Sequence, residues 1–314
     1  MADMTDSAFC RCLRPHAAGV VVFREMVSAE ALVRGNAKTL GMAAFLPEER
    51  PLVQQIFGAD PLVMAEAARL IDEKYAPEGI DINMGCPAHK IAGGFNGPAC
   101  RQAGAALMRR PELAAAIVRA VKAATRRPVS VKTRLGWSDP SEILEFIKVL
   151  EDAGADLITI HGRTKEQGYA GRADWKMIGR ARALVRVPVL ANGDIDSGPA
   201  AAEALRITGC AGVMIGRGAL GNPWIFAEAA AALAGSAYAA PTPDELLAEV
   251  RRHARVHADA VGGDAPLTTF RKHLGWHFKD RPGAKHIRTR LVRVSTLEEL
   301  DAILDEAAES GVIG

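Results

Sequence analysis

The most chemically informative residue of the sequence is Cys86, which follows a short segment that alternates polar and apolar residues. If this segment is a strand, Asp81 and Asn83 share one face and the apolar residues between them share the other. Gly85 and Pro87 bend the chain at the end of that strand and present the cysteine there. Cys86 could have a functional role or be a buried structural cysteine, and this segment alone does not decide between the two.

Polar residues also collect near the C-terminal ends of other predicted strands, which is where barrels of parallel strands place their active sites. These residues are Gln55, Ser130, Lys132, Arg134, Thr159, His161, Arg163, Asn192, Asp194 and Arg217. A lysine that points into a barrel is costly unless it meets a polar or anionic partner, and Asp81 could be that partner. The same pattern in several strands favours a ligand site instead. Because the cations of this set outnumber the carboxylates, we expect the ligand to be anionic.

Glycine-rich segments follow the last two predicted strands, at residues 192–194 and 216–218. Glycines let backbone N–H groups approach a ligand, and loops at these two strands often bind phosphate in (β/α)8 barrels. A lysine and an arginine near a phosphate site fit a phosphorylated cofactor that gains negative charge, as reduced flavin does. Pyridoxal phosphate is the competing cofactor, with Lys132 as its Schiff-base amine. The sequence has neither a Gly-x-Ser-x-Gly nor a His-Glu-x-x-His hydrolase motif.

A regular alternation of predicted strands and helices positions these residues and indicates a parallel α/β sheet. The predicted strands are 19–23, 52–57, 79–86, 128–134, 156–162, 187–194 and 211–217, and the predicted helices are 5–16, 60–74, 111–125, 141–153, 174–185, 198–207 and 223–234. An open doubly wound sheet is possible, but no Gly-x-Gly-x-x-Gly turn follows the first strand. We therefore expect a (β/α)8 TIM barrel whose first strand is short or truncated, with Met1–Met4 as its C-terminal tip.

A Pro-Thr-Pro linker at residues 241–243 ends the alternation, and only helices are predicted beyond it, at 243–261, 266–279, 283–294 and 296–309. We expect a catalytic domain over 1–238 and a small all-helical domain over 239–314. Basic residues crowd one part of the latter: Lys272, Lys279, Arg281, Lys285, Arg288, Arg290 and Arg293. A solvated charged face is the ordinary explanation, and a surface for nucleic-acid phosphates is the alternative.

The composition sets limits on the class of protein. A chain of 314 residues can hold one large α/β domain and a small one, and a net charge of +2 does not by itself indicate a nucleic-acid partner. The five cysteines are scattered and form no Cys-x-x-Cys pair, which predicts free thiols in the cytoplasm and no metal site. We find no signal peptide, and no apolar run approaches the roughly 20 residues of a membrane span.

Several of these motifs together resemble the flavin-dependent tRNA-dihydrouridine synthases, and the resemblance runs nearly end to end. The matching segments are Met1–Asp6 with Phe9, Gln55–Gly58, Asp81–Pro87, Lys132–Trp137, His161–Thr164, Asn192–Ile195, Gly216–Gly218 with Pro223 and Trp224, and Phe270–His273 in the helical tail. The Met-Gly-Cys-Pro and His-Gly-Arg-Thr segments are the most specific.

The resemblance implies an oxidoreductase that holds FMN across the barrel mouth and is reduced by NADPH or NADH. The implied cofactor-binding residues are Met1, Gln55, Lys132, His161, Asn192, Gly193, Asp194, Gly216 and Arg217. The implied substrate and tRNA residues are Asn83, Arg134, Arg163, Arg271, Lys272, Lys279, Lys285 and Arg288. A uridine flipped out of the tRNA would receive a hydride from flavin N5 at C6 and a proton from Cys86 at C5. A cysteine thiol suits this role because it is mostly protonated at pH 7. We expect a monomer that binds tRNA, with no membrane and no obligate protein partner.

Two departures from the family pattern concern the site. The first strand of the family ends in Ala-Pro-Met, and here only a methionine remains. The loop after Cys86 is longer than usual and contains Cys100, which is the fallback for the acid. Two other functions stay open: a flavin barrel that reduces a free pyrimidine, like dihydroorotate dehydrogenase, and a non-catalytic RNA-binding protein.

Overall fold

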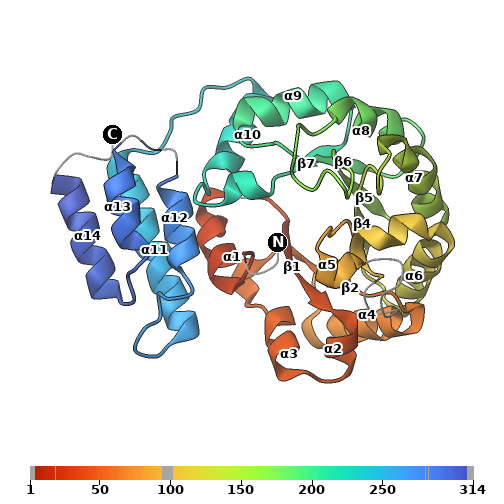
Figure 1. Ribbon diagram of the computed structural model, residues 1–314, viewed down its shortest axis with the longest axis horizontal. Helices are drawn as coiled ribbons and strands as arrows, with labels where there is room; N and C mark the ends of the chain where they lie inside the picture. The colour runs from red at the N-terminus through yellow and green to blue at the C-terminus, as the bar shows by residue number, and fades with distance from the viewer. Residues whose placement is uncertain (1–3, 18, 94–101, 280, 282, 310–314) are drawn as a thin grey trace. The chain divides into compact units, whose positions relative to one another are not determined.

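The computed structural model describes residues 4–17, 19–93, 102–279, 281 and 283–309. The chain divides into two compact units. The barrel unit consists of residues 1–4, 21–195 and 199–216, and the helical unit consists of residues 5–20, 196–198 and 217–314. Figure 1 shows both units, which are described one at a time below. The predicted domain boundary between residues 238 and 239 stays a prediction.

The barrel unit contains, within the described residues, seven strands that pair in sequence order, and every pair is parallel. The strands are β1 Val22–Ser28, β2 Leu52–Phe57, β3 Gly79–Met84, β4 Val129–Arg134, β5 Leu157–His161, β6 Val189–Asn192 and β7 Gly212–Met214. The sheet curls, and helices cover its outside (Figure 1). The predicted α/β fold of the TIM-barrel type is confirmed. The proposed strand tip at Met1–Met4 lies, except for Met4, outside the described residues.

Helices follow most of the strands and cover the outer face of the sheet. They are α4 Pro61–Tyr75, α6 Pro111–Ala124, α7 Ile143–Asp152, α8 Trp175–Arg182 and α9 Gly198–Thr208. Helix α4 begins where the sequence predicts, because the Asp60 side chain accepts from Leu62 N and Val63 N and proline occupies the first turn. The apolar residues of β3 are fully buried in one core with Met64 of α4 and Ile117 of α6. This parity leaves the polar residues of β3 on the inner face.

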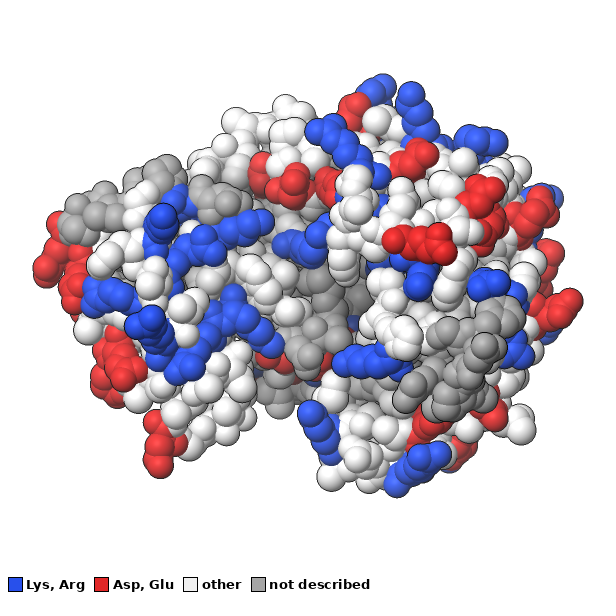
Figure 2. Space-filling view, viewed as in Figure 1, with Lys and Arg blue, Asp and Glu red and all other residues white. Residues whose placement is uncertain are grey.

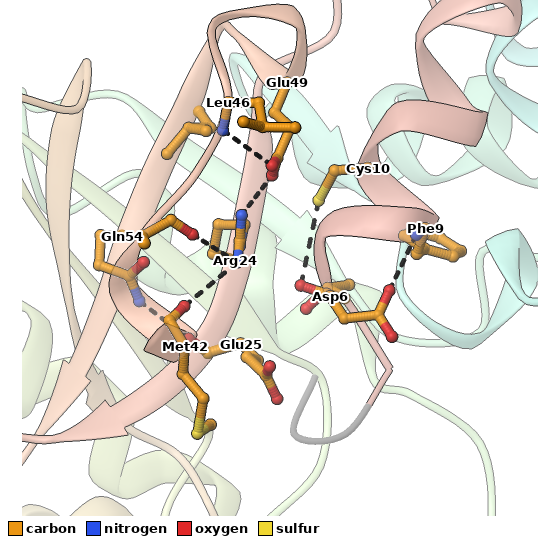
Figure 3. A network of polar contacts seen from close by, with 12 residues as sticks. Asp6, Phe9, Cys10, Arg24, Glu25, Met42, Leu46, Glu49 and Gln54 are labelled. Carbon is orange, nitrogen blue, oxygen red and sulfur yellow. Dashed lines mark hydrogen bonds and ion pairs between the residues drawn. The ribbon is translucent and has the colours of Figure 1, made fainter. Parts of the chain in front are cut away.

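The first strand differs from its predicted position. It begins at Val22 and continues through Arg24 and Glu25, whereas the predicted strand ended at Phe23. Figure 3 shows why a buried arginine is tolerated: Arg24 pairs with the fully buried Glu49, and its Nη2 donates to the carbonyls of Met42 (3.1 Å) and Ala44 (3.2 Å). The partners come from the segment before β2, so a local pattern does not reveal them.

That segment also contains helices absent from the sequence prediction, α2 Ala29–Val33 and α3 Ala37–Ala43. Ser28 and Asn36 begin them by accepting from the backbone N of Ala31 and Thr39. Both helices are short, so they carry too few turns for a recognisable helical period.

The helical unit packs around its own apolar core. Its helices are α1 Ser7–Leu13, α10 Ile225–Ala234, α11 Pro243–Val261, α12 Arg271–His277, α13 Ala284–Leu291 and α14 Leu297–Glu309. Helix α1 begins at the Asp6 cap, which accepts from Phe9 N (Figure 3). Helix α11 begins at the capping box of Thr242 and Glu245. The four predicted tail helices are confirmed, although α12 starts at Arg271 after a turn, later than the predicted residue 266. None of the helices described has the length and apolar composition to cross a bilayer.

Candidate active site

Four polar side chains of β2, β3 and β4 are joined on the inner face of the sheet. The fully buried Asp81 accepts from Gln55 Nε2 at 2.6 Å and from Ser130 Oγ at 2.5 Å. Gln55 Oε1 accepts in turn from Asn83 Nδ2 at 2.8 Å. Gln55, Asp81 and Ser130 stand opposite one another in the strand register, which is why three strands can contribute to one network. The parity prediction for these residues therefore holds.

The backbone around Cys86 is held from three directions. Asn83 Oδ1 accepts from Gly85 N at 3.2 Å and from Cys86 N at 2.9 Å. Arg134 Nε donates to Gly85 O at 2.7 Å, and Ala105 N donates to Cys86 O at 3.1 Å. The Cys86 side chain is a free thiol, and the residue is partly exposed. A rigid turn therefore presents this thiol at the C-terminal end of β3.

The backbone of Lys132 lies against this turn: a Cβ at Gly85 would be 3.4 Å from Lys132 O. Lys132 stands opposite Asn83 of β3 and Thr159 of β5, and it interacts electrostatically with both Asp81 and Cys86. Burial and the neighbouring Arg134 lower the pKa of Lys132 to about 8. Within the residues that the structure describes, its ammonium makes no hydrogen bond or ion pair. The alternative in which Lys132 forms a salt bridge with Asp81 is therefore not what this structure contains.

Asp81 responds to the same surroundings in the opposite direction. Burial raises the pKa of Asp81 to about 6, whereas the hydrogen bonds from Ser130 and Gln55 and the charge of Lys132 act to lower it. The inner face thus holds an acid and a base that are both harder to charge than in water. Two such groups beside a thiol are typical of a functional site.

His161 and the residues after β6 form a second cluster on the neighbouring strands. His161 stands opposite Arg134 on one side and Asn192 on the other. Gly193 lies directly against its ring: a Cβ at that position would sit 2.7 Å from His161 Cδ2. Asn192 Nδ2 donates to Met214 O at 2.7 Å, which ties the ends of β6 and β7 together. Asn192 and Gly193 therefore adjoin His161, whereas Asp194 pairs with Arg163.

The two arginines of this rim are engaged with protein groups. Arg163 donates to the carbonyls of Ala170 (3.1 Å) and Gly171 (2.6 Å) and pairs with Asp194 at 2.7 Å. Arg134 donates to Gly85 O and also to the carbonyls of the β5–α8 loop, at residues 164 and 168. Both side chains are buried. Their donors hold loops in place, which favours a positioning role over the predicted direct contact with substrate.

Other predicted cofactor residues are not placed in this cluster. Met1 lies outside the described residues, as does Cys100. Gly216 is the last residue of the barrel unit, and Arg217 begins the short helix η6 Arg217–Ala219 of the helical unit. The role of Met1, Gly216 and Arg217 in cofactor binding stays a prediction.

One residue at the site gave no signal in the sequence. Gly104 begins the short helix η4 Gly104–Arg109 with φ +59°, and a Cβ there would lie 2.9 Å from Cys86 O and 3.2 Å from Cys86 Cβ. A glycine at this position lets η4 pack against the cysteine turn. An isolated glycine 18 positions after Cys86 has no pattern that reveals such a contact.

The basic residues of the helical unit that the resemblance assigns to tRNA fall into two groups. Lys279, Lys285 and Arg288 are exposed, and Lys272 is partly exposed. Arg271 instead donates to the carbonyls of Arg293 and Val294 and to Ser295 Oγ. On the visible face of this unit, Figure 2 shows Lys and Arg gathered in a patch, and Arg290 forms an ion pair with Glu306 of α14. The exposed group suits phosphate contacts, whereas Arg271 stabilises the link between α13 and α14.

Phe270 and His273, which belong to the same segment of the resemblance as Arg271 and Lys272, are buried in the core of the helical unit. Their rings stack with centroids 5.3 Å apart. These two residues therefore stabilise the fold and do not face a ligand.

Parallel strands paired in sequence order, with polar side chains at their C-terminal ends, are typical of enzymes of the TIM-barrel class. A family model described as dihydrouridine synthase matches residues 1–312. A Synechocystis protein named probable tRNA-dihydrouridine synthase 1 is 40% identical over 310 residues, covering 98% of this chain and 84% of that protein. A Rhodobacter capsulatus protein named probable tRNA-dihydrouridine synthase is 41% identical over 297 residues, covering 94% and 89% respectively.

Among solved structures, a 2-naphthoyl-CoA reductase complex matches with a TM-score of 0.55 and 13% identity, over 74% of this chain and 48% of that one, which supports the fold alone. The chain belongs to the dihydrouridine synthase family, whose members are flavin-dependent oxidoreductases that reduce uridine in tRNA.

Proposed function

We propose that this protein reduces specific uridines of tRNA to dihydrouridine, with FMN as its cofactor and NADPH or NADH as the reductant. The observation that carries the proposal is a partly exposed thiol, Cys86, held by Asn83 beside an ammonium, Lys132, that has no hydrogen-bond or ion-pair partner among the described residues. A general acid next to a group that prefers an anion is the arrangement that reduction of a uracil ring requires.

The donors on the inner face fit a flavin. Lys132 has no ion pair within the described residues, and Gly193 adds no side chain of its own against the His161 ring. Gln55 and His161 line the same inner face of the sheet. These residues would hold the flavin ring, and Asn192, Gly193, Asp194, Gly216 and Arg217 would hold its ribityl chain and phosphate. When bound and reduced by NADPH or NADH, FMN would supply a hydride for C6 of the uracil.

The protein groups then have separate tasks. Cys86 Sγ donates the proton to C5 of the uracil, and Asn83 keeps the backbone of that cysteine in place. The Lys132 ammonium stabilises negative charge that develops in the site, because a cation in a partly desolvated site interacts strongly with an anion. Arg134 and Arg163 fix the loops around the substrate through their carbonyl contacts.

The tRNA backbone is proposed to lie on the helical unit, at Lys272, Lys279, Lys285 and Arg288. Such contacts supply affinity that falls with salt and carry little sequence information. We also propose that the protein is cytoplasmic, because bacteria such as Synechocystis and Rhodobacter capsulatus make tRNA in the cytoplasm.

The central experiment compares Cys86→Ala with Cys210→Ala, a second partly buried free cysteine that precedes β7. Cys86→Ala should bind flavin and oxidise NADPH normally, yet form dihydrouridine about a hundredfold more slowly, the usual contribution of a general acid. Cys210→Ala should resemble the wild type. Full product formation by Cys86→Ala would remove this cysteine from the mechanism.

A second experiment tests the substrate. Lys279→Ala, Lys285→Ala and Arg288→Ala combined should weaken tRNA binding and flatten its salt dependence. The control removes the same charge from exposed residues of the barrel unit, with Lys176→Ala, Arg180→Ala and Arg186→Ala. If the first variant bound and reduced tRNA as well as the control did, these basic residues would not form the tRNA surface. Reduction of a free pyrimidine without any reduction of tRNA would favour the alternative substrate. A purified protein that takes up no FMN would favour a non-catalytic RNA-binding protein.

A further inference from the structure

The hydrogen bonds on the inner face of the barrel have a direction that one residue determines. Asp81 lies at one end, and both of its oxygens act as acceptors, for Gln55 Nε2 and Ser130 Oγ. The Gln55 amide must therefore turn its NH2 group toward Asp81 and its oxygen away from it. That oxygen is the acceptor for Asn83 Nδ2.

The same logic fixes the next amide. Because Asn83 donates through Nδ2 to Gln55, its own oxygen faces the turn, where it accepts from Gly85 N and Cys86 N at 3.2 and 2.9 Å. Backbone N–H groups can only donate, so the far end of the chain demands the same direction as the carboxylate does. Reversing either amide would bring two donors or two acceptors together.

Water cannot substitute for these contacts. Asp81 is fully buried, and Gln55, Asn83 and Ser130 are each less than a tenth exposed. A lost contact therefore leaves a buried polar group unpaired, which costs more than losing an exposed hydrogen bond. The network is small, but each member depends on the one before it.

We infer that Asp81 is a positioning residue for Cys86: through Gln55 and Asn83 it sets the direction of the hydrogen bonds that hold the turn carrying the thiol. Asp81 itself touches neither the turn nor the thiol through any hydrogen bond that the described residues form. The inference rests on the proposed function for its catalytic meaning, but the positioning itself is a property of the protein alone.

The chemistry of position 81 predicts which substitutions matter. Asp81→Asn can keep its amide oxygen toward Gln55 and give its NH2 group to Ser130 Oγ, which accepts as readily as it donates. This variant should preserve the direction of the network. Asp81→Ala removes the acceptor, so the Gln55 amide loses its orientation, and the hold of Asn83 on residues 85 and 86 weakens.

The test measures the turn directly, without substrate. The rate at which iodoacetamide alkylates Cys86, resolved from the other cysteines by peptide mass spectrometry, reports exposure of the thiol. Hydrogen exchange of the peptide that contains residues 85 and 86 reports its backbone hydrogen bonds. Asp81→Ala should raise both rates about tenfold, as expected for one lost hydrogen bond, and Asp81→Asn should stay within about twofold of the wild type.

Ile82→Ala is the matched control, because Ile82 is the next residue of β3, is fully buried, and faces the outer core and not the network. It destabilises the strand without removing a polar contact, so it should raise exchange across the barrel with no excess at residues 85 and 86. The inference would be wrong if Asp81→Ala and Ile82→Ala gave the same alkylation and exchange rates at residues 85 and 86. It would also be wrong if Asp81→Asn raised these rates as much as Asp81→Ala did.

A milder variant covers the case in which Asp81→Ala does not fold. In the double variant Asp81→Asn with Ser130→Ala, the new NH2 group has no acceptor at position 130, so the amide is free to reverse toward Gln55. This pair should loosen the turn, whereas either single change should not; no loosening in the pair would overturn the inference. If these variants loosened the turn but the wild-type protein did not reduce tRNA, the proposed function would be wrong. The positioning role of Asp81 would still hold.

Discussion

Replacing Gly193 by alanine tests whether the site depends on close packing against His161. The added Cβ would lie 2.7 Å from His161 Cδ2 and 2.9 Å from Ala173 Cβ, and the backbone at Gly193 has φ +112°. Overpacking costs about 1–3 kcal/mol, and a left-handed backbone costs a non-glycine residue about 1–3 kcal/mol. Taking the middle of both ranges, we expect a loss of about 4 kcal/mol in the free energy of unfolding, together with displacement of the His161 ring.

Urea denaturation of the purified protein measures the loss, and the absorbance of bound flavin per protein chain measures the displacement. Gly209→Ala is the matched control, since Gly209 has φ +60° and nothing within 4 Å of an added Cβ. This variant carries only the backbone cost, about 2 kcal/mol, and should keep its flavin. Equal losses of stability in the two variants, with normal flavin content in both, would refute the idea that Gly193 is required by its contact with His161.

Three further predictions concern buried ionisable residues. Glu49→Gln should cost about 3–5 kcal/mol because it leaves Arg24 unpaired, and the double variant Glu49→Leu with Arg24→Met should cost less because it leaves no charge behind; urea denaturation measures both. The pKa of Asp81 is raised to about 6, so the folded state holds this proton more tightly than the unfolded state. Stability relative to Asp81→Asn should therefore fall by about 3 kcal/mol as pH rises from about 3 to about 7, and a flat difference would contradict the assignment. His273 has two unpaired ring nitrogens among the described residues, and burial lowers its pKa to about 3. As pH falls below 6.5, His273 takes up a proton in the unfolded state but not in the folded state, so the wild type loses stability. The free energy of unfolding of His273→Phe, measured by urea denaturation, should therefore rise relative to that of the wild type by about 2 kcal/mol as pH is lowered from 7 to 5.

The parity of the strands was readable from the sequence alone. Ile80, Ile82 and Met84 lie in the outer core, while Asp81 and Asn83 lie on the inner face, as their alternation predicts. Helix starts at proline and at capping residues were equally local, which is why the starts of α4, α6 and α11 agree with the prediction. A period of two residues in a strand and a cap within one turn involve only neighbours in the chain.

What the sequence could not decide is which polar group meets which partner. Lys132, Arg134 and Arg163 looked alike as inward-facing cations, but the two arginines donate to loop carbonyls and the lysine has no such partner in the described chain. The predicted first strand stopped before Arg24, because the sequence does not show that Glu49 pairs with this arginine. Partners of this kind come from segments distant in the sequence, and burial makes their identity decisive, because an unpaired charge inside the barrel costs several kcal/mol. The alternation of residues determined which side chains face inward; only the folded chain decided which of them remain available for chemistry.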